Sequence, residues 1–268
     1  MLPPPPRYKT RMPLTAIPAC IPRVALVTGG AHRLGRAISL ALAAAGFDIA
    51  VHAREPNDAI CAEIRQLGRR AVLLPADLAD EVQVTALLPA ATAALGPVGV
   101  LVNNASRFER DEWDDVTRDS WDAHIDTNLR APSVLIQAFA RQLPEAAEGV
   151  VVNMLDQRVW SLTPHFVSYT ASKAALWALT QTMALALAPR IRVNGIGPGP
   201  TLANARQTAE QFARQAASVP LGHGGSPEEV ARAVLAILAL PSMTGQMLAL
   251  DGGQHLQWHA YGDAPAEE

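Results

Sequence analysis

The chain has 268 residues, of which 49% are hydrophobic, and its formal net charge is −3, so it can bury one sizeable core and offers no basic surface suited to nucleic acid. No stretch approaches the about 18 uninterrupted apolar residues of a membrane span. The two cysteines, Cys20 and Cys61, are too isolated for a disulfide framework and suit a reducing compartment. We therefore expect a cytoplasmic protein with no nucleic-acid or membrane partner.

The first 22 residues are rich in proline. Four consecutive prolines occupy positions 3–6, and Pro13, Pro18 and Pro22 interrupt the apolar run that a secretory signal needs. We predict a disordered tail over residues 1–22, followed by a single domain over residues 23–268.

A buried strand is predicted over residues 24–28, followed by the loop TGGAHRLGRA (residues 28–37) and an alanine-rich helix that reaches residue 45. Gly29 and Gly35 bracket the loop. Glycines between a strand and a helix let backbone amides approach a pyrophosphate at the helix N-terminus. Arg33 stands where a middle glycine is common, so a plain tight turn stays an alternative interpretation.

The second predicted strand, residues 47–53, ends at a position that indicates cofactor preference. Dinucleotide folds that prefer NAD place an acidic residue there, whereas this chain has Ala53 followed by Arg54. A guanidinium binds a phosphate bidentately, so Arg54 favours the 2′-phosphate of NADPH. An exposed arginine without a role is the alternative.

The rest of the chain alternates strands with helices. Strands are predicted over residues 70–74, 98–102, 150–155, 191–196 and 246–250, and helices over residues 56–68, 80–95, 119–143, 171–187, 203–217 and 226–240. This alternation is typical of parallel sheets with right-handed crossovers. We predict an α/β fold, a Rossmann-like doubly wound parallel sheet of about seven strands with helices on both faces and no internal domain boundary.

Residues 150–173 bring three reactive side chains together. Asp156 lies just past the strand at 150–155, at the edge where open parallel sheets present their chemistry. Tyr169 and Lys173 stand four residues apart at the start of the next helix and share one of its faces. Because an ammonium favours the phenolate, we expect Lys173 to lower the pKa of Tyr169 toward neutrality. The pattern predicts a proton-transfer site; an ordinary surface pair is the alternative.

Five motifs stand in order along the chain: Thr28-Gly29, Asn-Asn-Ala at 103–105, Asn128, Tyr169-x-x-x-Lys173, and Pro-Gly at 198–199. In this order they resemble the short-chain dehydrogenase/reductase family over residues 23–253. The resemblance implies a nicotinamide cofactor, a homotetramer, and catalysis by Asn128, Tyr169 and Lys173. The cofactor-binding positions that it implies are Gly29, Arg33, Leu34, Gly35, Arg54, Asp77, Leu78, Asn104, Ala105, Tyr169, Lys173, Pro198, Gly199 and Thr201.

Asp156 departs from that family, which has a serine thirteen residues before the tyrosine. A narrower group, the pteridine reductases and related dihydromonapterin reductases, is similar in four places: an arginine in the glycine loop, an NNAS-x-aromatic segment, an N-M-x-D strand end at 153–156, and a DGG-x-H-L-like tail at 251–256. That resemblance implies substrate-binding roles for Arg33, Ser106, Phe108, Asp156 and Tyr169. The acid-rich stretch after Phe108 does not match, so the pterin side chain is not specified.

The charge of Asp156 favours a C=N substrate over a carbonyl. Carbonyl reduction builds negative charge on oxygen, and a carboxylate about 4 Å away would cost about 4 kcal/mol at an effective dielectric constant of about 20. The nitrogen of a C=N bond becomes more basic as hydride arrives, so a carboxylate tolerates it. We predict an NADPH-dependent reductase that converts a dihydropterin to a tetrahydropterin. A protonated Asp156 and a loop-capping Asp156 are the alternatives.

Two other functions stay open. The first is an NADPH-dependent carbonyl or 3-oxoacyl reductase in which Ser161 or Ser168, at a different spacing, replaces the missing serine. The second is an inactive cofactor-binding regulator, which the intact catalytic positions argue against. No metal is expected, because His255 and His259 lack a third ligand.

Overall fold

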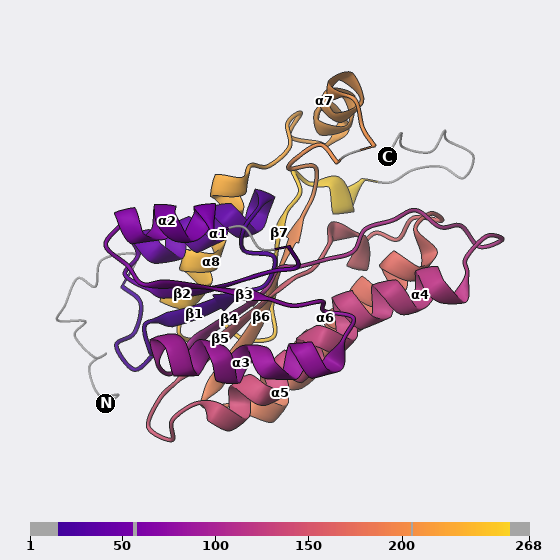
Figure 1. Cartoon of the computed structure of the whole chain (residues 1–268). Helices are drawn as coiled ribbons and strands as arrows, with labels where there is room; N and C mark the ends of the chain where they lie inside the picture. The colour runs from indigo at the N-terminus through magenta and orange to yellow at the C-terminus, as the bar shows by residue number, and fades with distance from the viewer. Residues whose placement is uncertain (1–15, 56–57, 205, 258–268) are drawn as a thin grey trace, which may run out of the picture.

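The computed structural model describes residues 16–55, 58–204 and 206–257. At its centre lies a sheet of seven strands in the order β3-β2-β1-β4-β5-β6-β7, in which every neighbouring pair is parallel (Figure 1). The strands are β1 (Val24–Val27), β2 (Asp48–Ala53), β3 (Ala71–Pro75), β4 (Val100–Asn103), β5 (Gly149–Met154), β6 (Ile191–Pro198) and β7 (Met247–Leu250). The predicted α/β fold is confirmed.

Helices connect successive strands. They are α1 (Arg33–Ala44), α2 (Ala59–Gln66), α3 (Glu81–Leu95), α4 (Arg118–Ile125), α5 (Ala131–Gln142), α6 (Val167–Leu187), α7 (Ala209–Ser218) and α8 (Pro227–Ala239). Local sequence explains several starts: Asp80 caps α3, Thr117 caps α4, and Ser226 caps α8 ahead of a proline in the first turn. In the described part of the chain, no helix combines the length and the apolar character that crossing a membrane demands.

Two layers of helices bury the sheet. Helices α1, α2 and α8 cover one face, and α3, α5 and α6 cover the other (Figure 1). The first layer packs Ile38 and Val234 against the strands, and the second packs Leu88 and Phe139. Strands β1, β2, β4 and β5 are buried at every position, which explains why they are mostly apolar rather than alternating between apolar and polar residues.

The strand order reverses direction between β1 and β4. In open α/β sheets, the crevice outside the carboxyl ends of the strands at such a switch point is where ligands bind. Gly29 follows β1, Asn104 follows β4, Asp156 follows β5 and Gly199 follows β6. The topology therefore brings most of the predicted site residues to one edge of the sheet.

Three helices differ from their predicted form, and one of them, α7, begins at Ala209 rather than at residue 203. The helix expected over residues 119–143 is divided into α4 and α5 by a π-helical turn, Asp126–Arg130, which contains Asn128. Helix α6 begins at Val167, so Tyr169 and Lys173 both lie in its first turns rather than at its edge. A single turn of 3-10 helix (Gln157–Val159) follows Asp156, and another (Gln254–Leu256) closes the D-G-G tail.

Residues 17–22, which precede β1, pack against the domain, although they were predicted to belong to a disordered tail. Residues 1–15 lie outside the described residues. Ile21 is only 1% exposed and belongs to the core, and Ile17 packs against the same cluster. Arg23 Nη2 donates to the Ile17 carbonyl oxygen at 2.9 Å. Because these apolar side chains are buried, the expectation of a disordered tail extending to residue 22 is wrong for residues 17–22.

Candidate active site

The loop after β1 keeps its shape through two glycines and an asparagine. Gly29 has a φ of +61°, which glycine adopts without strain. A Cβ on Gly35 would lie 2.0 Å from the Gly29 carbonyl oxygen and 2.6 Å from Asn104 Nδ2, so α1 can approach β1 this closely only with glycine there. Asn104 Nδ2 donates to the Thr28 carbonyl oxygen at 2.8 Å, and Ala105 N donates to Thr28 Oγ1 at 3.0 Å. Four predicted cofactor positions thus form one cluster at the switch point.

The N-terminus of α1 fits an anionic group. Its N-cap residue, His32, makes no side-chain hydrogen bond to the first turn, and that turn has no acidic residue. Helices α3 and α8 are instead capped by Asp80 and Ser226. Uncapped first-turn amides at the positive end of a helix dipole suit a phosphate. Leu34, also a predicted cofactor position, packs against the core beside this turn.

His52 is a site residue that the sequence patterns did not indicate. Its Nδ1 accepts the Gly29 N–H at 3.1 Å, and its Nε2 lies 3.0 Å from the Ala76 carbonyl oxygen, so Nε2 carries the proton. Burial lowers the pKa of His52, which keeps the ring neutral as these bonds require. The sequence feature that could have indicated its role is the presence of a histidine in the otherwise mostly apolar strand DIAVHA.

The predicted residues for the adenosine end of the cofactor lie at the ends of β2 and β3. Arg54 follows β2 and is exposed, and it lies on the same sheet edge as Gly29 because β1 and β2 are parallel neighbours. Asp77 Oδ1 accepts the Ala79 N–H at 2.9 Å and shapes the turn after β3, where Leu78 is buried.

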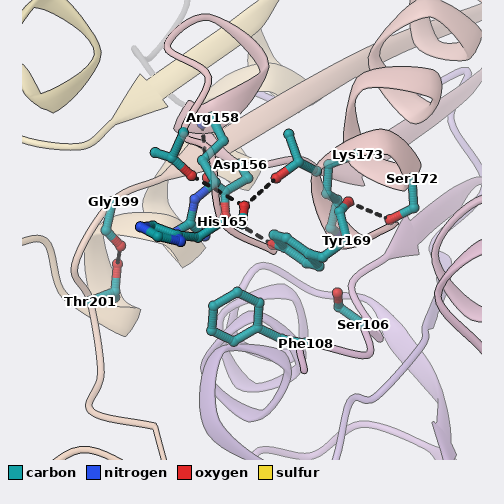
Figure 2. Close-up of polar contacts among 12 residues, drawn as sticks. Ser106, Phe108, Asp156, Arg158, His165, Tyr169, Ser172, Lys173, Gly199 and Thr201 are labelled. Carbon is teal, nitrogen blue, oxygen red and sulfur yellow. Dashed lines mark hydrogen bonds and ion pairs between the residues drawn. The ribbon is translucent and has the colours of Figure 1, made fainter. Parts of the chain in front are cut away.

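Strand β6 delivers Pro198, Gly199 and Thr201 to the same edge. A Cβ on Gly199 would lie 2.7 Å from Asp251 Cα, so only glycine fits there. Thr201 Oγ1 donates to the Gly199 carbonyl oxygen at 3.0 Å and closes the turn (Figure 2). Asp251 Oδ2 accepts the His255 N–H at 2.8 Å, which folds the D-G-G tail back toward this turn.

Three of the predicted catalytic side chains lie together at the end of β5 (Figure 2). Tyr169 OH donates to Asp156 Oδ2 at 2.8 Å, and Lys173 Nζ donates to the Met154 carbonyl oxygen at 2.8 Å. Asp156 Oδ1 accepts the Arg158 N–H at 2.8 Å. Both carboxylate oxygens therefore accept hydrogen bonds, which is the pattern of an ionised aspartate.

The pKa values at this site differ from the sequence expectation. Burial, and after it the charge of Asp156, raises the pKa of Tyr169 well above its ordinary value, and the cation that opposes this rise is Arg158. Burial lowers the pKa of Lys173 to about 8. The prediction that Lys173 brings the phenol toward neutrality is therefore wrong, because the lysine bonds to a backbone carbonyl while the phenol bonds to a carboxylate. Tyr169 holds its proton and can donate it.

Asn128 bonds to the segment after β4 rather than to Tyr169 or Lys173. Its Oδ1 accepts the Arg107 N–H at 2.8 Å and the Ser106 hydroxyl at 3.2 Å. Its Nδ2 donates to the Arg107 carbonyl oxygen at 2.9 Å and to Ser172 Oγ at 3.0 Å. The extra residue of the π-helical turn locally rewinds the helix at Asn128. Asn128 therefore anchors the segment that carries Phe108.

Phe108 stands beside the tyrosine and at the pocket. Its ring stacks on Phe166 with a centroid separation of 4.6 Å and an interplanar angle of 7°, and it meets the Tyr169 ring edge-on at 4.7 Å. The Arg206 guanidinium lies 5.4 Å from the Phe108 centroid, and its Nη2 donates to the Phe108 carbonyl oxygen at 3.1 Å. A flat cation thus already covers the aromatic ring that was predicted to stack on a flat substrate.

Arg33 links the glycine loop to the segment after β6. Its Nη1 donates to the Ala203 carbonyl oxygen at 2.8 Å, and its Nη2 donates to that of Leu202 at 3.2 Å. Its backbone φ is +50°, an uncommon value for a residue with a side chain. The guanidinium consequently lies beside Leu202 in the lining of the pocket.

One pocket of about 180 Å³ brings together Arg33, Phe108, Asp156 and Tyr169 with the β6 turn. Its other walls come from residues that the sequence patterns did not indicate: Gln157, Arg158, Pro200, Leu202, Asn204, Gln207, Phe212, Gln215 and Gln254. Five of these side chains are neutral carboxamides, which can both donate and accept hydrogen bonds. The one sequence feature that could have indicated Arg158 as a pocket residue was its position two residues after Asp156.

Neither serine weighed as a substitute takes the place of the missing one. Ser168 is 0% exposed, and its Oγ donates to Asp111 and lies 2.7 Å from His124 Nδ1. His124 Nε2 accepts the Glu109 N–H at 3.1 Å, so these bonds tie the segment after Phe108 to α6. The described residues that line the pocket do not include Ser161.

His259 lies outside the described residues, and His255 Nδ1 lies 2.7 Å from Asp251 Oδ2. Across residues 16–55, 58–204 and 206–257, no three metal-ligating side chains gather in one place.

Comparisons with known proteins place this fold and site in one family. The family model of short chain dehydrogenases matches residues 23–214, and the chain belongs to the short-chain dehydrogenase family as an oxidoreductase. A crystal structure of FolM alternative dihydrofolate reductase 1 from Brucella canis, complexed with NADP, is 45% identical with a TM-score of 0.87, and the match covers 91% of this chain and 98% of that one.

More distant relatives have other or unassigned activities. An uncharacterized oxidoreductase of Mycobacterium tuberculosis is 34% identical over 86% of this chain and 91% of its own length. A 3-oxoacyl-[acyl-carrier-protein] reductase of Staphylococcus aureus is 32% identical over 87% of this chain and 98% of its own length. The predicted resemblance to the short-chain family, close to pterin-related members, is confirmed.

Proposed function

We propose that the protein is an NADPH-dependent reductase that transfers a hydride to the C=N bond of a dihydropterin. The observation that carries the proposal is the hydrogen bond from Tyr169 to Asp156, at the position where a serine is usual in the family. The 45% identity to the Brucella FolM alternative dihydrofolate reductase complexed with NADP supports both the cofactor and the class of substrate.

The cofactor fits the residues present. The uncapped N-terminus of α1 and the glycine loop suit the pyrophosphate, and Arg54 suits a 2′-phosphate. Pro198 and Thr201, across the switch point, would face the nicotinamide end. Bound NADPH would supply the hydride.

The chain itself supplies the proton. As a C–H bond forms at the substrate carbon, the electron pair of the C=N bond moves to nitrogen, which takes the proton from Tyr169 OH. Asp156 orients the phenol, and a nitrogen that takes the proton before the hydride arrives carries a positive charge, which the carboxylate attracts. Lys173 Nζ lies 5.8 Å from the Tyr169 ring centroid and donates to the Met154 carbonyl oxygen at 2.8 Å, so it holds the end of β5 beside the phenol.

A second candidate is an NADPH-dependent carbonyl or 3-oxoacyl reductase, which the 32% identity to the Staphylococcus aureus 3-oxoacyl reductase favours. Two features oppose it. Asp156 places a carboxylate where a hydroxyl donor would stabilise an oxyanion. The carboxamide-rich pocket wall suits a heterocycle with several donors and acceptors better than it suits an acyl chain.

The test is to follow NADPH oxidation with dihydrobiopterin, dihydromonapterin, dihydrofolate and an acetoacetyl thioester in parallel. We expect kcat/KM to be highest for one of the three pterin-type substrates. Turnover of the thioester alone would refute the proposal and favour the second candidate. Tyr169→Phe, measured with the same substrates, shows how much of the signal comes from this site.

We also propose the homotetramer that the family resemblance implies. Leu185 of α6 is 83% exposed, and a groove between α5 and α6 is lined by Ile136, Met183 and Leu187. Apolar surface of this kind marks an interface. Light scattering measures the mass directly, and a monomer would contradict the proposal.

A further inference from the structure

Arg158 is a buried cation beside the proposed proton donor. Its side chain is 6% exposed, and its Nη1 lies 3.9 Å from Asp156 Oδ2, the same oxygen that accepts the Tyr169 hydroxyl. The guanidinium carbon lies 4.9 Å from the Phe166 centroid and 5.6 Å from the Phe108 centroid. The side chain thus lies against both the aromatic pair and the carboxylate, and it lines the pocket. Figure 2 shows Arg158 beside Asp156.

The 3-10 turn after β5 fixes this placement. Asp156 Oδ1 accepts the Arg158 N–H at 2.8 Å, so one carboxylate binds the backbone of Arg158 and faces its side chain. The stacked Phe108 and Phe166 rings then limit the conformations that the guanidinium can adopt. Its backbone hydrogen bond and the two rings therefore hold the Arg158 side chain in a defined position beside Asp156.

Counting charges shows what Arg158 does during proton donation. Asp156, whose two oxygens both accept hydrogen bonds, counts as one negative charge, and Arg158 and Lys173 count as one positive charge each. Proton donation by Tyr169 takes these four groups from one net positive charge to zero. Without Arg158, the same step would take them from zero to one net negative charge, with the phenolate oxygen 2.8 Å from the Asp156 carboxylate and Lys173 as the one positive charge among the groups counted. Neighbouring like charges in a buried site oppose ionisation.

We propose that Arg158 is a specificity-determining residue, which offsets the charge of Asp156 while Tyr169 gives up its proton. The inference rests on the proposed function only in taking Tyr169 as the donor. With Arg158 present, Asp156 discriminates less against a carbonyl than an isolated carboxylate would. Loss of Arg158 should therefore slow reduction of both substrate classes, and slow carbonyl reduction more, because the oxyanion would then face an unscreened negative charge.

A double-mutant cycle on the full chain tests this role. The variants are Arg158→Met, which keeps an unbranched apolar stem against the rings, Asp156→Asn, and the two combined. Each is assayed with NADPH on a dihydropterin and on a small 3-oxo ester. We expect Arg158→Met to lower kcat about tenfold or more in the parent, and about threefold or less when Asp156 is already asparagine, because the charge to be offset is gone. Arg158→Lys should restore most of the loss.

Arg110 offers a matched control. Its guanidinium also lies over Phe166, at 5.7 Å from the centroid, but it pairs with Glu112 rather than with Asp156. Arg110→Met should leave kcat on both substrates unchanged. Melting temperature and NADPH affinity of each variant separate a folding defect from a catalytic one.

Equal losses from Arg158→Met in both backgrounds would overturn the proposal, because Arg158 would then act through packing alone. An equal loss from Arg110→Met would overturn it for the same reason. Failure of the pterin assignment is a different result: the parent would prefer the ester, and the cycle would still be measured on that substrate.

Discussion

Replacing Asp156 with serine should exchange the substrate preference of the enzyme. Asp156 Oδ2 lies 2.8 Å from the Tyr169 oxygen, so a substrate atom that receives the phenol proton would lie about 4 Å from the carboxylate. At an effective dielectric constant of about 20, the interaction between unit charges at that distance is about 4 kcal/mol. Arg158 Nη1 is 3.9 Å from the same oxygen, and if it offsets about half of this, about 2 kcal/mol remains.

That residual energy sets the expected magnitude. About 2 kcal/mol corresponds to roughly 30-fold in rate, so Asp156→Ser should raise kcat/KM for a 3-oxo ester by roughly that factor. Turnover of a dihydropterin should fall by about tenfold or more, because the substrate nitrogen that takes the proton loses the carboxylate that attracts its positive charge. Asp156→Asn is the matched control, since its amide oxygen can still accept the Tyr169 hydrogen bond without a charge. It should share the gain on the ester.

Both activities and the NADPH affinity are measured on one preparation of each variant. The charge argument is refuted if the serine variant reduces dihydropterin as well as the parent and gains nothing on the ester. Asp156 would then act only as the cap of the 3-10 turn.

Four further outcomes are expected. Tyr169→Phe should lower kcat by about 100-fold or more while the NADPH dissociation constant, measured by fluorescence, stays unchanged; full turnover would mean another proton donor. Ala53→Asp combined with Arg54→Leu should reverse the ratio of kcat/KM for NADPH to that for NADH, and a parent without any preference contradicts this. Burial lowers the pKa of Lys173 from 10.5 to about 8. Between those pH values the unfolded chain binds a proton that the folded chain lacks, so the free energy of unfolding should rise with pH by about 3 kcal/mol. In urea unfolding without cofactor, Lys173→Met should remove that rise, and an identical pH dependence in the variant would count against it. Removing residues 1–15 should leave the melting temperature nearly unchanged. A deletion that also removes Ile21 should lower it, because burial of that side chain contributes about 1.5–3 kcal/mol to the free energy of unfolding. Equal melting temperatures for the two deletions would show that Ile21 contributes nothing.

The parallel sheet could be predicted because its strands are short, mostly apolar segments that alternate with helical ones. The run at 150–155 and the glycine loop after residues 24–28 are local signals that do not depend on their neighbours in space. The π-helical turn at Asn128 gave no such signal. It coincides with hydrogen bonds to the Arg107 backbone, 21 residues away, which no local pattern contains.

The sequence indicated which residues lie together at the candidate site better than it indicated which hydrogen bonds they make. Spacing indicated that Asp156, Tyr169 and Lys173 share an edge, but it did not indicate that the lysine faces the Met154 carbonyl while the phenol faces the carboxylate. The direction of the Tyr169 pKa shift depends on that difference. Arg158 was missed because its spacing from Asp156 does not show whether a long side chain turns inward or outward.

Phe108 is held from both sides, by Asn128 at Ser106 and Arg107 and by His124 at Glu109. The fixed points are backbone groups and buried polar side chains, and none of them is the Phe108 ring itself. The backbone on both sides of position 108 is therefore fixed by hydrogen bonds that do not involve the Phe108 side chain. A different side chain there would reshape the surface offered to a substrate and the packing against Tyr169, while the backbone on either side stayed in place.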